Sequence, residues 1–195
     1  MKQRSSKVDN GSLSRKLQVR RYMLDRLSSR SELRVLDCCA GERVIWERLR
    51  KEYPVKSYLG LDIKPRRSGV VRIDSARWLR QVDWHANVID VDTYGDPWRH
   101  WLAILEKARE PVAVFLTAGC GWGGLSEHQD ELYKSAGLRP EWHDRIQRNS
   151  PALMEYLTRS ILTRKPASDI ITQEIVSIAS VRSCATYYGV RMERS

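Results

Sequence analysis

Carboxylates follow short apolar segments at four places in the first half of the sequence. They are Asp37, Asp62, Asp74 and, within "VIDVDTYGDPW", the pair Asp90 and Asp92. A carboxylate at the end of a buried segment costs free energy unless a partner or ligand satisfies it. A cluster of them predicts a site for a positively charged ligand rich in hydrogen-bond donors. A dinucleotide phosphate is excluded, because no GxGxxG motif is present and carboxylates repel phosphate. The alternative for any single aspartate is an N-cap of the following helix.

The elements that must position these aspartates alternate between strands and helices. Strands are predicted at 33–36, 57–61, 69–73, 87–91 and 111–117, and helices at 42–53, 75–81, 97–109, 125–136 and 151–164. Asp96-Pro97 predicts a helix start with Asp96 as N-cap and Pro97 in the first helical position. Such alternation is typical of a parallel sheet covered on both faces. Ligands of these sheets bind beyond the carboxyl ends of the strands, where the aspartates are expected.

The two ends of the chain complete this architecture. The segment over 13–27 places Leu13, Leu17, Leu24 and Leu27 on one helical stripe. Residues 169–181 and 185–194 form two strand-like runs joined by a short polar stretch, which predicts a hairpin. We therefore expect an α/β fold with a mostly parallel seven-stranded sheet that ends in an antiparallel hairpin and is preceded by an N-terminal helix. Residues 1–12 are expected to be flexible and 13–195 to form a single domain.

Composition limits the classes of function. The chain has 195 residues, 42% of them hydrophobic, and no apolar run near the about 20 residues of a membrane span. Its polar start lacks the apolar region of a signal peptide, so a cytoplasmic location is expected. Neither the four cysteines nor the four histidines have metal-ligand spacing, which favours reduced thiols and no metal. The net charge of +10 favours an anionic partner such as nucleic acid.

Three segments resemble, in order and spacing, the first three motifs of class I S-adenosylmethionine-dependent methyltransferases. "RVLDCCAGER" is similar to the motif strand-Asp-x-Phe-x-Gly-x-Gly. "YLGLDIKP" resembles the second motif, whose acidic residue holds the ribose hydroxyls, and "VRIDSARWL" the third, which faces the adenine. The resemblance extends from about Arg34 to Arg194. It implies a Rossmann-like methyltransferase fold and S-adenosyl-L-methionine as the cofactor.

The resemblance assigns a cofactor role to several residues of this sequence. Asp37 would approach the methionine part of the cofactor, Asp62 would accept the ribose hydroxyls, and Asp74 would face the adenine amino group. Arg43 departs from the pattern, since the family usually has a second glycine there. The implied cofactor-binding residues are Asp37, Gly41, Asp62, Ile63, Asp74, Ser75 and Asp90.

"DVDTYGDP" resembles a fourth motif, found in methyltransferases that act on exocyclic amino groups of nucleobases. That motif is (Asp/Asn/Ser)-Pro-Pro-(Tyr/Phe/Trp), and the match is closer to the Asp-x-Asp-Pro-(Tyr/Phe)-Gly form of tRNA guanine-N2 methyltransferases. Asp92 is then the acid, Thr93 replaces the proline and Tyr94 is the aromatic residue. The implied catalytic chemistry is that a carboxylate and a backbone carbonyl accept the amine N–H bonds while an aromatic ring stacks on the base. The alternative places Asp92 in a turn and Tyr94 in the core.

Two segments are candidates for contact with the substrate. "GCGWGG" follows the fifth strand and offers Trp122 for base stacking, and "GLRPEWHDRIQRNSP" offers Trp142, Arg145 and Arg148. The basic side chains of the first helix, between Arg15 and Arg26, are a further candidate, with an ordinary solvated face as the alternative.

The favoured function is methyl transfer from S-adenosylmethionine to an exocyclic amine of a nucleobase, in RNA rather than DNA, without a metal or a covalent nucleophile. One alternative is a methyltransferase for small molecules. Another is a catalytically silent module that binds the cofactor and nucleic acid, because Arg43 and Thr93 depart from the motifs.

Overall fold

Seven strands form one sheet in the order β3-β2-β1-β4-β5-β7-β6. The computed structural model describes residues 12–27, 32–93, 97–119, 137, 151–164, 168–180 and 185–195. The first five strands run parallel, and β7 pairs antiparallel with both β5 and β6, which confirms the predicted sheet and hairpin. The strands are β1 (Leu33–Asp37), β2 (Val55–Asp62), β3 (Val70–Arg72), β4 (Val88–Val91), β5 (Val112–Ala118), β6 (Ile170–Ala179) and β7 (Thr186–Arg194).

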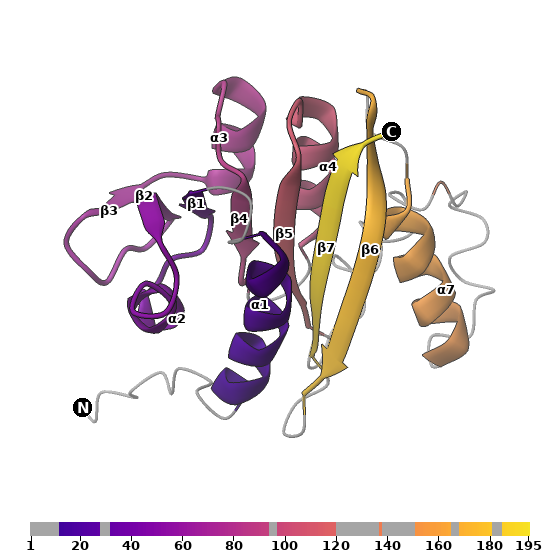
Figure 1. The fold of residues 1–195 in the computed structure, drawn as a ribbon, viewed down its shortest axis with the longest axis horizontal. Helices are drawn as coiled ribbons and strands as arrows, with labels where there is room; N and C mark the ends of the chain where they lie inside the picture. The colour runs from indigo at the N-terminus through magenta and orange to yellow at the C-terminus, as the bar shows by residue number, and fades with distance from the viewer. Residues whose placement is uncertain are drawn as a thin grey trace, which may run out of the picture.

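Helices cover both faces of the sheet. They are α1 (Leu13–Leu27), α2 (Val44–Leu49), α3 (Ser75–Gln81), α4 (Trp98–Lys107) and α7 (Pro151–Leu162). Figure 1 shows α1 in front of the sheet and α3 and α4 behind it. Two separate cores follow from this: α1 and α2 bury Met23 and Trp46 on one face, whereas α3, α4 and α7 bury Leu79, Trp101 and Ile161 on the other. The helix predicted over 125–136 lies outside the described residues.

Two predicted helix starts are wrong by one or two residues. The second helix begins at Val44 instead of residue 42, because Arg43 has φ 61° and ψ 15°, a left-handed conformation that ends regular helix geometry. Helix α4 begins at Trp98, and Pro97 is its N-cap instead of its first helical residue. The carbonyl of Pro97 accepts the N–H groups of His100 and Trp101, as an N-cap carbonyl does. Asp96, the predicted N-cap, lies outside the described residues.

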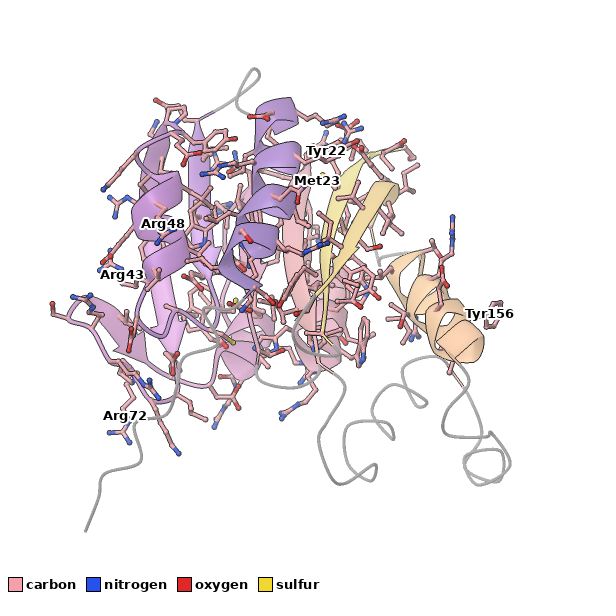
Figure 2. The ribbon with its side chains drawn as sticks, turned by 90° about the horizontal axis from the view of Figure 1, so that it is seen from below. Tyr22, Met23, Arg43, Arg48, Arg72 and Tyr156 are labelled. Atoms are coloured by element: carbon pink, nitrogen blue, oxygen red, sulfur yellow. The ribbon has the colours of Figure 1, made fainter. Side chains whose placement is uncertain are left out.

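Helix α1 packs closely on the hairpin because a glycine faces it. A Cβ atom on Gly189 of β7 would lie 2.9 Å from Met23 Cγ and 3.1 Å from Val19 Cγ1. Figure 2 shows Met23 on the side of α1 next to the β6–β7 hairpin. This close approach places the polar edge of α1 near the carboxyl ends of β4 and β5.

Within the described residues, no helix combines the length and apolar character that a membrane span needs.

Candidate functional site

The loop after β1 bridges the ends of the two neighbouring strands. Cys38 N donates to the carbonyl of Asp90 in β4, and Ala40 N donates to the carbonyl of Leu61 in β2. Gly41, with φ 48°, turns its N–H toward Asp62 Oδ2 at 2.9 Å. The strand order reverses between β1 and β4, so this loop lies where a ligand of a parallel sheet is expected.

Strand β2 ends at the carboxylate of Asp62, and the next residue, Ile63, has an exposed apolar side chain. Asp62 Oδ2 accepts the Gly41 N–H, and Oδ1 accepts the Lys64 N–H at 2.7 Å. Each carboxylate oxygen can accept a further hydrogen bond. Ile63 is 62% exposed although it lies two residues after the fully buried Leu61. The pair therefore presents an acceptor and an apolar contact to whatever binds at this edge.

Asp74 serves as an N-cap, the alternative that the sequence left open. Its Oδ1 accepts the N–H groups of Ala76 and Arg77 at 3.0 and 3.2 Å. The neighbouring Ser75 is buried, and its Oγ lies 2.9 Å from Nε2 of His100 in α4. Burial lowers the pKa of His100 to about 4, so its ring is neutral near pH 7. The capping bonds use Oδ1 alone and fix Asp74 and Ser75 at the start of α3.

Asp37 lies in a low-dielectric and acidic environment. The side chain is buried, and Oδ2 accepts the Tyr58 hydroxyl at 2.8 Å. Burial raises the pKa of Asp37 well above its usual range, and the nearby carboxylate of Asp90 raises it further. Asp37 and Asp90 are direct neighbours across the β1–β4 pairing. A positive charge on a ligand would offset this repulsion.

Arg43 keeps a backbone conformation that glycine adopts most easily. The conformation costs about 1–2 kcal/mol in a residue with a Cβ. The side chain bridges to the β2–β3 connection: Nη1 donates to the Ser68 carbonyl at 3.3 Å, and the guanidinium lies 4.8 Å from the Tyr58 ring centroid. Arg43 thus replaces the expected glycine but keeps the left-handed backbone conformation that a glycine would allow at this position.

Asp90 is a partner of the N-terminal helix. Its carboxylate accepts Arg20 Nε at 2.8 Å, Arg20 Nη2 at 2.5 Å and Trp46 Nε1 at 2.8 Å. Both charged side chains are 1% exposed. From the sequence, Asp90 is expected among the cofactor residues; in the structure its carboxylate is engaged by these buried donors. Its backbone carbonyl accepts the Cys38 N–H and so holds the start of the loop after β1.

Asp92 forms a second ion pair with the same helix. Lys16 Nζ donates to both carboxylate oxygens at 2.7 Å, and Thr117 Oγ1 in β5 donates to Oδ1 at 2.6 Å. Burial alone would raise the pKa of Asp92, but the Lys16 ammonium and the Arg20 guanidinium outweigh that effect and lower it. Thr93 Oγ1 donates to the Thr117 carbonyl at 3.1 Å, which ties the residue after Asp92 to β5.

Part of the basic side of α1 is used inside the protein, through Lys16 and Arg20. Arg20 is buried against Asp90, so it can neither contact a phosphate nor form a solvated face. Lys16 pairs with Asp92, and its side chain is 15% exposed. Two further pairs, Arg21 with Glu52 and Arg26 with Glu174, lie nearer the surface. The two inner ion pairs could not be predicted from the helix alone, because their carboxylates lie at the end of a distant strand.

The remaining predicted site residues lie outside the described part of the chain. They are Tyr94, Trp122, Trp142, Arg145 and Arg148. In the ranges that are described, no group of three or more histidine, cysteine, aspartate or glutamate side chains has the arrangement of a metal site. Cys38 and Cys39 are free cysteines.

The sequence did not assign a role at this edge to Lys16 and Arg20, which were candidates only for contact with the substrate, or to Trp46, Tyr58 and Thr117. One signal for the first two was present. Lys16 and Arg20 are four residues apart on a helix, and Asp90 and Asp92 are two apart on a strand. The two spacings are nearly equal in length, so the pairs can match. Tyr58 and Trp46 carry no such signal, because aromatic residues on a strand and a helix are usually core.

Comparison with solved structures identifies the fold. The sequence matches no protein-family model and no curated protein. Trm1 from Pyrococcus horikoshii, solved with S-adenosyl-L-methionine, superimposes with a TM-score of 0.60 at 17% identity, over 94% of this chain and 55% of Trm1. The chain thus spans about half the length of that protein.

Two further structures are similar over most of their own length. YhhF of Escherichia coli, described as a methyltransferase, has a TM-score of 0.55 at 11% identity, over 98% of this chain and 90% of its own. TYW2 from M. jannaschii, solved in complex with AdoMet, has a TM-score of 0.50 at 11% identity, over 95% and 77%. At these identities the likeness concerns the fold alone. The chain has the Rossmann-like α/β fold of methyltransferases.

Proposed function

We propose that the protein is a methyltransferase that uses S-adenosylmethionine to methylate an exocyclic amino group of a nucleobase, in RNA rather than DNA. The observation that carries the proposal is the acidic carboxyl edge of the sheet. Asp92 stands there with a lowered pKa, on the strand next to β1 and its buried Asp37, in a fold shared with methyltransferases.

The residues at this edge fit the cofactor. The cofactor is cationic, and its ammonium and sulfonium charges would relieve the repulsion that raises the pKa of Asp37. Asp62 can accept ribose hydroxyls beside the exposed Ile63, which offers an apolar contact to adenine. A Cβ on Gly41 would meet only Cys39 O, at 3.9 Å, so the backbone there is open to close approach. When bound, the cofactor supplies an electrophilic methyl group on sulfur.

Asp92 would orient the substrate amine. The nitrogen of a base amine is a weak nucleophile, because its lone pair is delocalised into the ring. Asp92 Oδ2 accepts only the Lys16 donor among the described residues, so it retains a lone pair for an amine N–H. The nitrogen lone pair forms the new N–C bond while the electrons of the C–S bond stay on sulfur, and the surplus N–H proton passes to Asp92. The carbonyl of Thr93 would accept the second N–H, and Tyr94 would stack on the base.

Nucleic acid as the substrate is supported by charge. The net charge is +10, and Lys64, Arg67 and Arg72 are exposed and form no ion pair within the described part of the chain. Figure 2 shows Arg72 at the outer edge of the molecule. Lys64 and Arg67 follow β2, and Arg72 at the end of β3 pairs in register with Asp62. These side chains can contact the phosphates of a bound nucleic acid. We place Trp122, Trp142, Arg145 and Arg148 in the same interface.

The proposal is tested by methyl transfer to nucleic acid from cells that lack the protein. RNA and DNA are incubated with the protein and S-adenosylmethionine labelled in the methyl group, digested to nucleosides and analysed by mass spectrometry. We expect the label on an exocyclic nitrogen of one RNA nucleoside. Label on ribose or on a ring carbon would contradict the amine as target, and failure of the protein to bind S-adenosylmethionine would overturn the cofactor assignment.

A further inference from the structure

Helix α1 presents two cations to two carboxylates at matched spacing. Lys16 and Arg20 are one helical turn apart and pair with Asp92 and Asp90, which lie on the same side of β4 and its extension. A helical spacing of four residues covers about 6 Å, and two residues of a strand cover about 6.6 Å. Arg20 is buried and anchors the helix, so Lys16 is held over Asp92 by the fold itself.

Lys16 is fixed from several sides. Its Nζ lies 2.7 Å from both Asp92 oxygens and 5.5 Å from the ring centroid of Tyr187 in β7. Thr117 Oγ1 donates to Asp92 from β5. Donors from the described residues therefore fill three of the about four acceptor positions of the carboxylate, and the position that they leave on Oδ2 has a defined direction.

The surroundings of Asp92 favour its neutral form unless a cation is present. Burial disfavours the charge on Asp92, and the carboxyl of Asp37 and the thiol of Cys39 lie near enough for Asp92 to raise their pKa values. The charges that oppose them come from α1 alone among the described elements, as Lys16 and Arg20. Arg20 is already engaged with both oxygens of Asp90, which leaves Lys16 as the direct partner of Asp92.

We propose that Lys16 is a positioning residue of the methyl-transfer site: its ammonium keeps Asp92 anionic and fixes the carboxylate so that Oδ2 faces the substrate amine. This inference rests on the proposed function. It makes the helix that precedes the first strand part of the active site. A protonated Asp92 could not take the proton that the amine loses, so the charge on Lys16 sets the lowest pH at which the enzyme works.

The test compares Lys16→Met and Lys16→Arg with Arg21→Met, a control on the same helix. Arg21 pairs with Glu52 at the surface, with side-chain exposures of 44% and 38%. The titration of the Asp92 carboxyl is followed by ¹³C NMR of protein labelled in aspartate, with Asp92→Asn used for assignment. We expect Lys16→Met to move the Asp92 titration, and the acid limb of the pH profile of turnover, upward by about 1–3 pH units. In Lys16→Arg and Arg21→Met, the Asp92 titration and the acid limb of the pH profile should stay at the pH values of the parental protein.

An unchanged Asp92 titration in folded Lys16→Met would overturn the inference. Faster methyl transfer by Lys16→Met near neutral pH would also overturn it, because Lys16 would then block the site. If Lys16→Met does not fold, Lys16→Gln gives the same comparison without the charge. If the parental protein transfers no methyl group, the proposed function fails, whereas the NMR titration still decides whether Lys16 controls Asp92.

Discussion

Arg20 of α1 and Asp90 of β4 form an ion pair inside the protein. Two guanidinium nitrogens lie 2.8 and 2.5 Å from the two carboxylate oxygens, and Trp46 Nε1 donates a third bond at 2.8 Å. The guanidinium also lies 5.3 Å from the ring centroid of Phe115. Because both charges are out of water, each depends on the other for its solvation. The pair connects the N-terminal helix to the strand that carries Asp92.

Arg20→Met should destabilise the protein strongly. It leaves Asp90 as a buried carboxylate without its cation, and breaking such a pair by removing one partner typically costs about 3–5 kcal/mol. Urea denaturation followed by circular dichroism measures the free energy of unfolding. Arg21→Met is the control, because its exposed pair with Glu52 is worth about 1 kcal/mol or less. Equal losses in the two variants would show that Arg20 is not the anchor described here.

His100 should make the stability of the protein depend on pH below neutrality. Burial lowers its folded-state pKa to about 4, and its Nδ1 is buried without a hydrogen-bond partner among the residues that the structure describes. In the unfolded chain a histidine titrates near about 6.5. Between these values the unfolded chain binds a proton that the folded protein does not, so stability is present above about 6.5 and falls as the pH drops toward 4.

The contribution of His100 is measured by thermal unfolding across this range. The parental protein should lose up to about 3 kcal/mol through His100 between pH 7 and 4. His100→Gln retains a polar group near Ser75 Oγ but cannot take up a proton. Its melting temperature should therefore decline less steeply with falling pH. Parallel pH profiles for the two proteins would mean that His100 does not contribute in this way.

The order of elements was predictable from the sequence, because the apolar segments and their turn signals are local. Strand β4 and helix α3 were predicted within one residue. The partners of the aspartates were less accessible, since Lys16 and Asp92 are separated by 76 residues and meet only through the sheet order. Asp74 shows the ambiguity of a single aspartate, because it caps α3 at the same edge where the family motif places an adenine contact. The left-handed backbone conformation of Arg43 could be expected only from its position, where the family motif has a glycine.

Asp62→Ala should weaken binding of S-adenosylhomocysteine by about 2–3 kcal/mol, because the variant loses charge-assisted hydrogen bonds to the ribose. It also frees the Gly41 N–H from its acceptor. Isothermal titration calorimetry measures the affinity. Asp83→Ala is a matched control, since the Asp83 side chain is 92% exposed and pairs with Lys107 at the surface. An unchanged affinity in Asp62→Ala would remove Asp62 from the cofactor site.

The role of Asp92 is tested by the rate of methyl transfer by Asp92→Asn at saturating S-adenosylmethionine. The variant keeps the shape of the side chain, but it loses the charge that orients the amine and accepts its proton. The contact of Asp92 with the substrate amine stabilises the transition state and does not involve the cofactor. Turnover should therefore fall roughly 100- to 1000-fold while cofactor affinity stays near the parental value. Asp83→Asn serves as the control for the loss of a carboxylate. Near-parental turnover by Asp92→Asn would contradict the assignment of Asp92 and, with it, the nucleobase amine as substrate.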